Sequence, residues 1–152
     1  MTHETSPNQI VDSARRWIGT PYRHQASKCG VGTDCLGLIR GVYREIYALE
    51  PETPPPYSAD WAEVPDLNDA RVETMAEAAR RHLIELDVAD TRPGDVLLFR
   101  MTRGAVAKHA AIESFEGRMI HACSGRAVAE VHMGAWWPRH LAFAFRFPGE
   151  LT

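Results

Sequence analysis

The sequence predicts an α+β fold in which helices come first and an antiparallel sheet follows. In the first half of the chain, apolar residues recur at helical spacing. After residue 92 they instead form short runs bounded by turn residues, which is the pattern of strands. Helices grouped before strands are typical of α+β domains. At 152 residues, one domain covering residues 1–152 is expected.

The first helix is expected to begin at Pro7, which suits the first helical position. Ser6 can cap the helix, and Gln9 stands three residues later, where a capping box places it. Apolar residues then recur at helical spacing until Gly19, which is typical of a helix end. The loop that follows is expected over residues 23–33.

Two more helical patterns cover residues 34–48 and 66–86, and the proline-rich connector Pro51–Pro56 lies between them. The period then changes to that of strands. Five strands are expected, at Asp95–Arg100, His109–Phe115, Arg118–Cys123, Ala127–Met133 and Leu141–Phe147. The N-terminal helices should pack on this five- or six-stranded antiparallel sheet.

Composition excludes several classes of protein. The net charge of −3 provides no basic field, so direct nucleic-acid binding is not expected. No run of about 18 apolar residues is present, so no membrane span is expected. Three cysteines do not make a disulfide framework. The first residues lack the basic and apolar regions of a secretory signal, so we expect synthesis in the cytoplasm without a signal peptide.

Cys35 is the candidate nucleophile. A glycine-rich loop over residues 30–33 leads to Asp34, which can cap a helix, and an apolar helical run follows the cysteine. The thiol should therefore lie in the first turn of a helix, where unpaired N–H groups and the helix dipole stabilise a thiolate. The sequence thus predicts a thiol that is ionised near neutral pH.

His109 and His121 differ from the other histidines because both fall in one predicted hairpin. Residues opposite each other in an antiparallel pair share a face, and so do side chains two positions apart. A two-residue loop would place the two imidazoles on opposite faces. A three-residue loop, which pairs Ser114 with Arg118, would place them on one face as diagonal neighbours. We predict an odd loop or a bulge.

These positions suggest a catalytic triad. His109 would take the thiol proton or form an ion pair with the thiolate, and would later protonate the leaving amine. His121 would accept a hydrogen bond from the other ring nitrogen of His109 and orient it. The backbone N–H of Cys35 would stabilise a tetrahedral oxyanion.

Five blocks of residues resemble the NlpC family of papain-like cell-wall cysteine peptidases, and their order and spacing agree over roughly residues 8–147. The G-T-P-Y and D-C-x-G-L blocks together are specific, although either alone is weak. The blocks are Ala14–Tyr22, Gly32–Leu38, Arg92–Phe99, His109–Ile112 and Ile120–Ala122.

The resemblance implies an endopeptidase that cleaves peptidoglycan stem peptides, commonly between D-glutamate and a diamino acid, with Cys35, His109 and His121 as its catalytic residues. It implies no metal and no cofactor. Tyr22 aligns with a tyrosine that contacts substrate or oxyanion in relatives. Asp34 aligns with an acidic residue that meets the free amine of the stem peptide, although a helix cap explains it equally well.

The short single domain, without a signal peptide or cell-wall repeat modules, is similar to the phage-tail and gene-transfer-particle branch of the family, and the expectations that follow rest on this analogy. Such enzymes open the cell wall locally during DNA delivery. The expected partners are therefore the stem peptide and phage-like tail-tip or hub proteins. The expected location is a virion or particle tail that acts on the periplasmic wall of the target cell.

Two other functions stay open. One is a structural tail or baseplate protein whose peptidase site is vestigial. The other is a zinc-binding module formed by Cys29, Cys35, His109 and His121, since two cysteines and two histidines are a valid ligand set. The five-residue gap between the two cysteines is unusual for such a site. Cys123 is expected to pack in or beside the sheet.

Overall fold

The computed structural model describes residues 5–54 and 73–149, and it confirms the α+β architecture. Its main sheet has six antiparallel strands in the order β3-β8-β4-β5-β6-β7. The strands are β3 (Ile84–Leu86), β4 (Val96–Phe99), β5 (His109–Glu113), β6 (Arg118–His121), β7 (Ala129–His132) and β8 (Leu141–Arg146).

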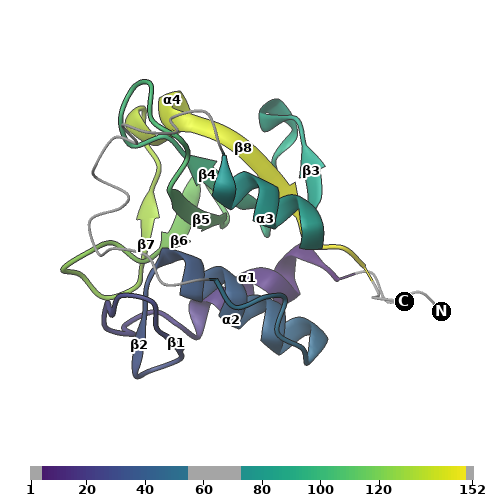
Figure 1. Ribbon diagram of the computed structural model, residues 1–152, viewed down its shortest axis with the longest axis vertical. Coiled ribbons are helices and arrows are strands. Elements are labelled where there is room, and N and C mark those ends of the chain that lie inside the picture. Colours follow the sequence, from purple (N-terminus) through teal and green to yellow (C-terminus); the bar gives the residue numbers. More distant parts are fainter. Residues whose placement is uncertain (1–4, 55–72, 150–152) are drawn as a thin grey trace.

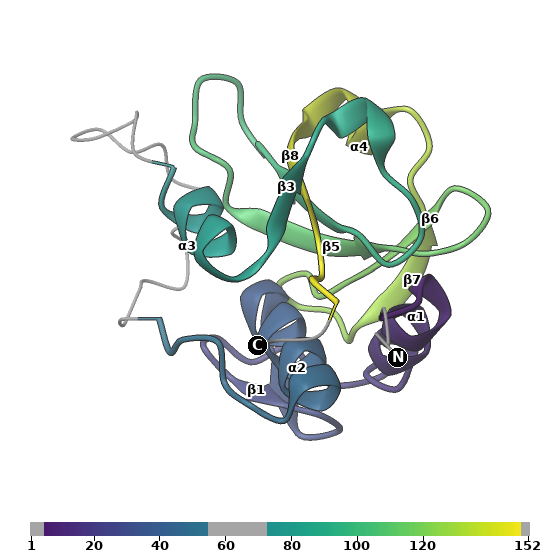
Figure 2. The same cartoon turned by 90° about the vertical axis from the view of Figure 1, so that its right-hand side faces the viewer.

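Within the described ranges, four helices and a short 3₁₀ turn accompany the sheet. They are α1 (Pro7–Arg15), α2 (Cys35–Tyr47), α3 (Thr74–His82), the turn η1 (Val88–Asp90) and α4 (Trp136–His140). Helices α1 and α2 contact each other and β5, and they form one layer below the sheet in Figure 1. Figure 2 shows α3 beside β3, away from α1. The beginning of α2 is thereby held against the start of β5.

The start of α1 agrees with its sequence signals. The Ser6 hydroxyl accepts a hydrogen bond from the Gln9 N–H at 3.2 Å, and the Gln9 side chain accepts one from the Ser6 N–H at 3.0 Å. This reciprocal capping box satisfies two N–H groups that a helix start leaves unpaired. The Arg15 guanidinium then binds both carboxylate oxygens of Glu130 at 3.0 Å, which ties α1 to β7.

The segment expected as a loop over residues 23–33 contains a small hairpin, β1 (Ser27–Lys28) paired with β2 (Gly32–Thr33). This hairpin packs closely on the first turn of α2. A Cβ at Gly37 would lie 2.0 Å from the carbonyl oxygen of Ala26, which is too close for any side chain. Gly37 is therefore required for the loop before Cys35 to approach the helix.

The third helical pattern was predicted to continue to residue 86, and this prediction is wrong at its C-terminal end. Helix α3 ends at His82, and residues 84–86 form β3, which pairs with β8. Pairing with β8 satisfies the backbone groups that a longer helix would have used, so tertiary context overrides the helical pattern. The predictions for Pro55, Pro56 and residues 66–72 lie outside the described residues.

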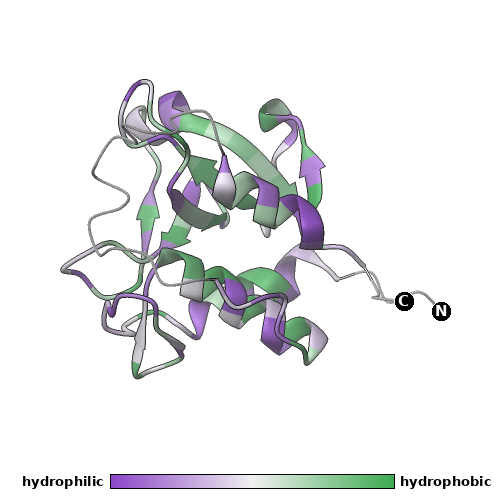
Figure 3. Ribbon diagram, in the orientation of Figure 1, coloured by the Kyte–Doolittle hydropathy of each residue, from purple (hydrophilic) through white to green (hydrophobic). Residues whose placement is uncertain are grey.

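Apolar side chains are buried on both faces of the sheet. One cluster lies between the helices and the sheet and includes Leu38, Val42, Ile112 and Phe145. The second lies on the other face, where Phe99, Ala111 and Met119 pack together. Figure 3 shows the hydrophobic residues along α2 and the central strands. Within residues 5–54 and 73–149, no helix combines the length and the hydrophobicity needed to cross a membrane.

Candidate active site

The β5–β6 hairpin has the odd loop that the sequence predicted. Glu113 pairs with Met119, and the Ser114 N–H donates to the Arg118 carbonyl at 2.8 Å, which leaves three residues in the turn. Two of them, Glu116 and Gly117, have positive φ angles of 60° and 71°. With this register, His109 and His121 are diagonal neighbours on one face of the sheet.

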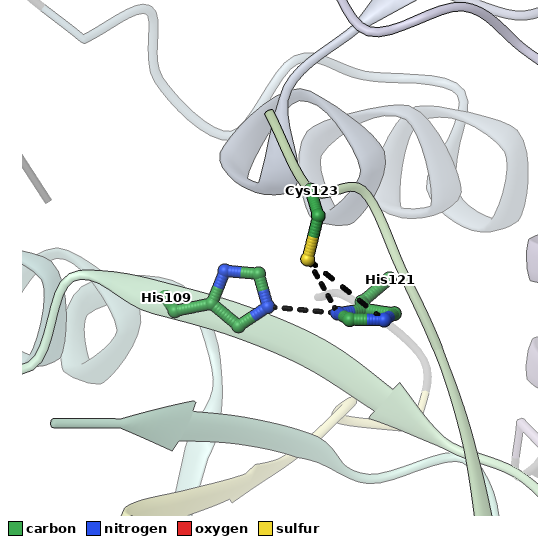
Figure 4. Close-up of side chains that lie close together, drawn as sticks. All are labelled: His109, His121 and Cys123. Atoms are coloured by element: carbon green, nitrogen blue, oxygen red, sulfur yellow. Dashed lines mark hydrogen bonds between the residues drawn. The ribbon is translucent and has the colours of Figure 1, made fainter. Parts of the chain in front are cut away.

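The two imidazoles are joined by a hydrogen bond, as Figure 4 shows. Nε2 of His109 lies 2.9 Å from Nδ1 of His121, and the rings meet nearly edge to face at 84°. When Nε2 of His109 carries the proton and donates it to this bond, Nδ1 of the same ring keeps its lone pair. Nδ1 points away from His121 in Figure 4, so it is the ring atom able to accept a proton.

Trp137 covers the histidine pair. Its ring stacks on His109 at 5.3 Å and meets His121 edge to face, also at 5.3 Å. Burial, together with the neighbouring His121, lowers the pKa of His109 to about 3. Burial also lowers the pKa of His121 to about 4. Both rings are therefore neutral at pH 7, the state in which His109 can act as a base.

Cys35 is the first residue of α2, and Asp34 caps the helix. One carboxylate oxygen of Asp34 accepts from the Gly37 N–H at 2.7 Å, and the other accepts from the Gln25 N–H at 2.8 Å. The carboxylate is buried, and it connects the start of the helix to the preceding loop. These contacts give Asp34 the capping role that the sequence left as one of two alternatives.

The sulfur of Cys35 lies against the backbone of β5. Sγ is 3.9 Å from the carbonyl oxygen of Lys108, the residue before His109, and only 9% of Cys35 is exposed. Among the residues that the structure describes, no hydrogen bond joins this sulfur to either imidazole. The structure thus brings the two histidines together and places the thiol beside the backbone that carries one of them.

The prediction of a resting thiolate at Cys35 is wrong. Burial, together with the negative charge of Asp34, raises the pKa of the thiol to about 12. Burial removes water from the thiolate and destabilises it. This effect is larger than the stabilisation that the start of the helix and the nearby backbone N–H groups provide. In the resting site, both the Cys35 thiol and the His109 imidazole are therefore neutral. The alternative of a thiolate–imidazolium ion pair is not supported.

Timed alkylation with iodoacetamide tests the protonation state. At neutral pH, exposed Cys29 should react first and Cys35 far more slowly, because Cys35 is buried and almost entirely un-ionised. Peptide mapping by mass spectrometry separates the two cysteines. The Cys35 rate should continue to rise with pH into the alkaline range. Rapid alkylation of Cys35 that does not change between pH 6 and 8 would instead show a thiolate.

The remaining sequence candidates have distinct positions. Tyr22 is partly buried, forms an isolated bridge with Thr33, and thus lies next to the segment that leads into Cys35. Cys29 is exposed, and its thiol donates to the Arg16 carbonyl at 3.3 Å. The proposed zinc ligand set is not assembled: among the described residues, the histidine pair is grouped with Cys123 and not with Cys29 or Cys35.

Sequence reasoning missed the contacts that Cys123 and Trp137 make with the histidine pair. Cys123 Sγ lies 3.3 Å from Nδ1 of His121, two residues beyond it, as Figure 4 shows. The position two residues after His121 was a signal for this contact, because alternate residues of a strand share a face. Trp136 and Trp137 are adjacent, but the structure gives them different surroundings. Trp137 packs on the sheet, whereas Trp136 is 45% exposed.

Comparison with known proteins gives consistent results. The chain is 26% identical over 144 residues to the gamma-DL-glutamyl hydrolase of Bacillus subtilis; this match covers 94% of the chain but only 30% of that relative. The NlpC/p60 domain of the peptidoglycan hydrolase SagA superposes with a TM-score of 0.62 at 22% identity, covering 94% of this chain and all of that domain.

A lipoprotein-like NLP/P60 protein from Staphylococcus aureus superposes with a TM-score of 0.63 at 20% identity, covering 98% of this chain and 44% of that protein. At these identities the structures establish the fold. The sequence match to the NlpC/P60 family runs over residues 19–146, a range that includes Cys35, His109 and His121. The chain therefore belongs to the NlpC/P60 family, whose members are cysteine peptidases that hydrolyse peptidoglycan.

Proposed function

We propose that this protein is a cysteine endopeptidase that hydrolyses stem peptides of peptidoglycan, with Cys35 as nucleophile, His109 as base and His121 as the residue that orients the base. The observation that carries the proposal is the 2.9 Å bond between Nε2 of His109 and Nδ1 of His121. It fixes the ring of His109 and leaves Nδ1 able to accept a proton. Family membership supports the same reaction.

In the first half of the reaction, Nδ1 of His109 takes the Cys35 thiol proton as the sulfur attacks the peptide carbonyl carbon. The oxyanion that forms is stabilised by the N–H of Cys35, which lies in the first helical turn and lacks an acceptor in its own helix. Sulfur and base start without a direct hydrogen bond, and catalytic hydrogen bonds that are long in an unliganded enzyme often tighten when substrate binds.

In the second half, Nδ1 of His109 gives its proton to the leaving amine nitrogen, the C–N bond breaks, and a thioester with Cys35 remains. Water then attacks the thioester carbonyl while Nδ1 removes a proton from it. The C–S bond breaks, and the sulfur regains a proton from the imidazolium. The products are a carboxylic acid and an amine, and both side chains return to their neutral resting states.

The proposed scissile bond joins D-glutamate to the diamino acid of the stem peptide. The relative from Bacillus subtilis is named a gamma-DL-glutamyl hydrolase, which is the same class of glutamyl linkage. Because this chain spans only 30% of that relative, the bond is part of the proposal and not a transferred property.

A synthetic stem peptide of L-alanine, γ-linked D-glutamate and diaminopimelate tests the proposal. Mass spectrometry after digestion should show L-alanyl-D-glutamate as one product. Cys35→Ala should lower the rate by at least about 10³-fold, because the nucleophile is lost. Cys29→Ala is the matched control, since Cys29 is exposed and its thiol donates a hydrogen bond to the Arg16 carbonyl.

Three results would contradict the proposed function. Equal cleavage by the Cys35→Ala variant would remove the cysteine mechanism. Release of the intact peptide from muramic acid in a muropeptide digest would indicate an amidase. An unchanged substrate, with wild-type protein that remains folded, would favour a structural protein with a vestigial site.

We further propose that the hydrolase belongs to a phage-like tail or gene-transfer particle and acts on the periplasmic wall of the target cell during DNA delivery. This setting is supported by analogy with that branch of the family. Mass spectrometry of purified particles and immunogold labelling should place the chain at the tail tip beside hub proteins. Its absence from particles that still open cell walls would overturn the setting without affecting the proposed chemistry.

A further inference from the structure

We propose that His109, His121 and Cys123 form a binding site for Zn²⁺ and that the bound ion inhibits hydrolysis. The three side chains offer two imidazole nitrogens and one sulfur, and these atoms all lie within 4.8 Å of one another. Imidazole and thiolate are the preferred ligands of zinc in proteins. The catalytic mechanism uses the two histidines but leaves Cys123 without a role.

The separations between these atoms are close to those of zinc ligands. With Zn–N and Zn–S bonds of about 2.1 and 2.3 Å, neighbouring ligand atoms of a tetrahedral site lie roughly 3.3–3.6 Å apart. The structure has 2.9 Å between Nε2 of His109 and Nδ1 of His121, and 3.3 Å between that Nδ1 and Sγ of Cys123. The third separation, between the ligand atoms of His109 and Cys123, is within 4.8 Å, so small shifts of the three side chains would convert this hydrogen-bonded group into a set of three ligands.

The position of Cys123 provides access for an ion. Both histidines are buried, with 6% and 8% exposure, but Cys123 is only partly buried, and the turn that follows it at residues 124–126 is exposed. Three protein ligands also leave the fourth position of a tetrahedral ion open to water, as in sites that exchange ligands. The ion would therefore enter from the Cys123 side without unfolding of the sheet.

Binding would disable the base by moving a proton. Cys123 would release its thiol proton to solvent, and Nε2 of His109 would use its lone pair to hold the metal. A neutral imidazole with a metal on Nε2 carries its proton on Nδ1. Nδ1 could then no longer accept the Cys35 proton. The inhibition rests on the proposed function, whereas the binding rests only on the three side chains.

Cobalt titration tests the binding without any measurement of activity. Co²⁺ added to the metal-free protein should produce a thiolate-to-cobalt charge-transfer band that saturates at one ion per chain, and Zn²⁺ should displace it. The band should persist in Cys29→Ser and Cys35→Ala and be lost in Cys123→Ser and Cys123→Ala. Absence of the band in the wild type, its loss in Cys35→Ala, or its persistence in both Cys123 variants would overturn the site.

Zinc inhibition is measured separately, with each variant compared with its own metal-free rate. Zn²⁺ should inhibit the wild type and Cys29→Ser over the concentration range in which it displaces cobalt. Cys123→Ser should need at least about tenfold more Zn²⁺, because loss of even an outer-shell partner weakens metal binding tenfold or more. Equal zinc sensitivity of Cys123→Ser and wild type would overturn the inhibition. An inactive wild type that still shows the cobalt band would refute the proposed function but not the metal site.

Discussion

Replacing His109 by glutamine should lower kcat for stem-peptide hydrolysis by about 10²–10⁴-fold, the range that a positioned general acid–base contributes. Glutamine has a similar volume and can still hydrogen-bond to His121, but it cannot accept the proton of the Cys35 thiol. Because burial and Asp34 keep that thiol neutral, it depends on a base for activation. Rates on the synthetic stem peptide, measured with circular dichroism to verify folding, provide the test.

His132→Gln is the matched control for this experiment, since His132 is an exposed histidine on the neighbouring strand β7 and should keep the wild-type kcat. A His109→Gln variant with wild-type kcat would show that another group takes the thiol proton.

His121 should behave as a positioning residue. His121→Ala removes the acceptor 2.9 Å from Nε2 of His109 and should lower kcat roughly 10²-fold, because misplacement of a catalytic group by about 1 Å has an effect of that size. His121→Gln restores an acceptor and should recover part of the loss. If alanine and glutamine at this position gave the same kcat, hydrogen bonding to His109 would not be the role of His121.

The local signals of the sequence were sufficient for much of this site. An odd number of residues in the hairpin loop places His109 and His121 on the same face of the sheet, and an even number would place them on opposite faces. The cap at Asp34 likewise identified the start of α2 and the position of Cys35 in its first turn. Such features depend on residues close together in the sequence, or on the register that one turn sets.

Features that depend on long-range packing were not predictable in the same way. The pKa of Cys35 is set by the water that β5 excludes, and no local pattern near residue 35 reports that burial. Strand β3 forms because β8, more than fifty residues later, offers an unpaired edge. Trp137 covers His109 through helix α4, whose five residues have no clear helical period of their own.

Acid should destabilise the folded protein well above the range in which carboxylates titrate. His109 and His121 have pKa values of about 3 and about 4 when folded, below the ordinary value near 6.5 that they regain on unfolding. Between these values the unfolded chain binds more protons, so stability is full above pH 6.5 and falls as pH decreases. From pH 7.5 to pH 5, the loss is about 2 kcal/mol for each histidine, or about 4 kcal/mol together.

Urea unfolding at pH 7.5, 6 and 5 measures this dependence, and the midpoint should decrease while the slope of the transition stays constant. The double variant His109→Gln, His121→Gln should lose most of the pH dependence, even if it is less stable at pH 7.5. Ion pairs such as that of Arg15 with Glu130 do not account for a loss of stability between pH 7.5 and pH 5, because the lowered pKa of Glu130 keeps that carboxylate ionised at pH 5. A wild type as stable at pH 5 as at pH 7.5 would mean that the folded protein protonates the pair at little cost. The rings would then be hydrated, and the burial beneath Trp137 that keeps His109 neutral would not hold in solution.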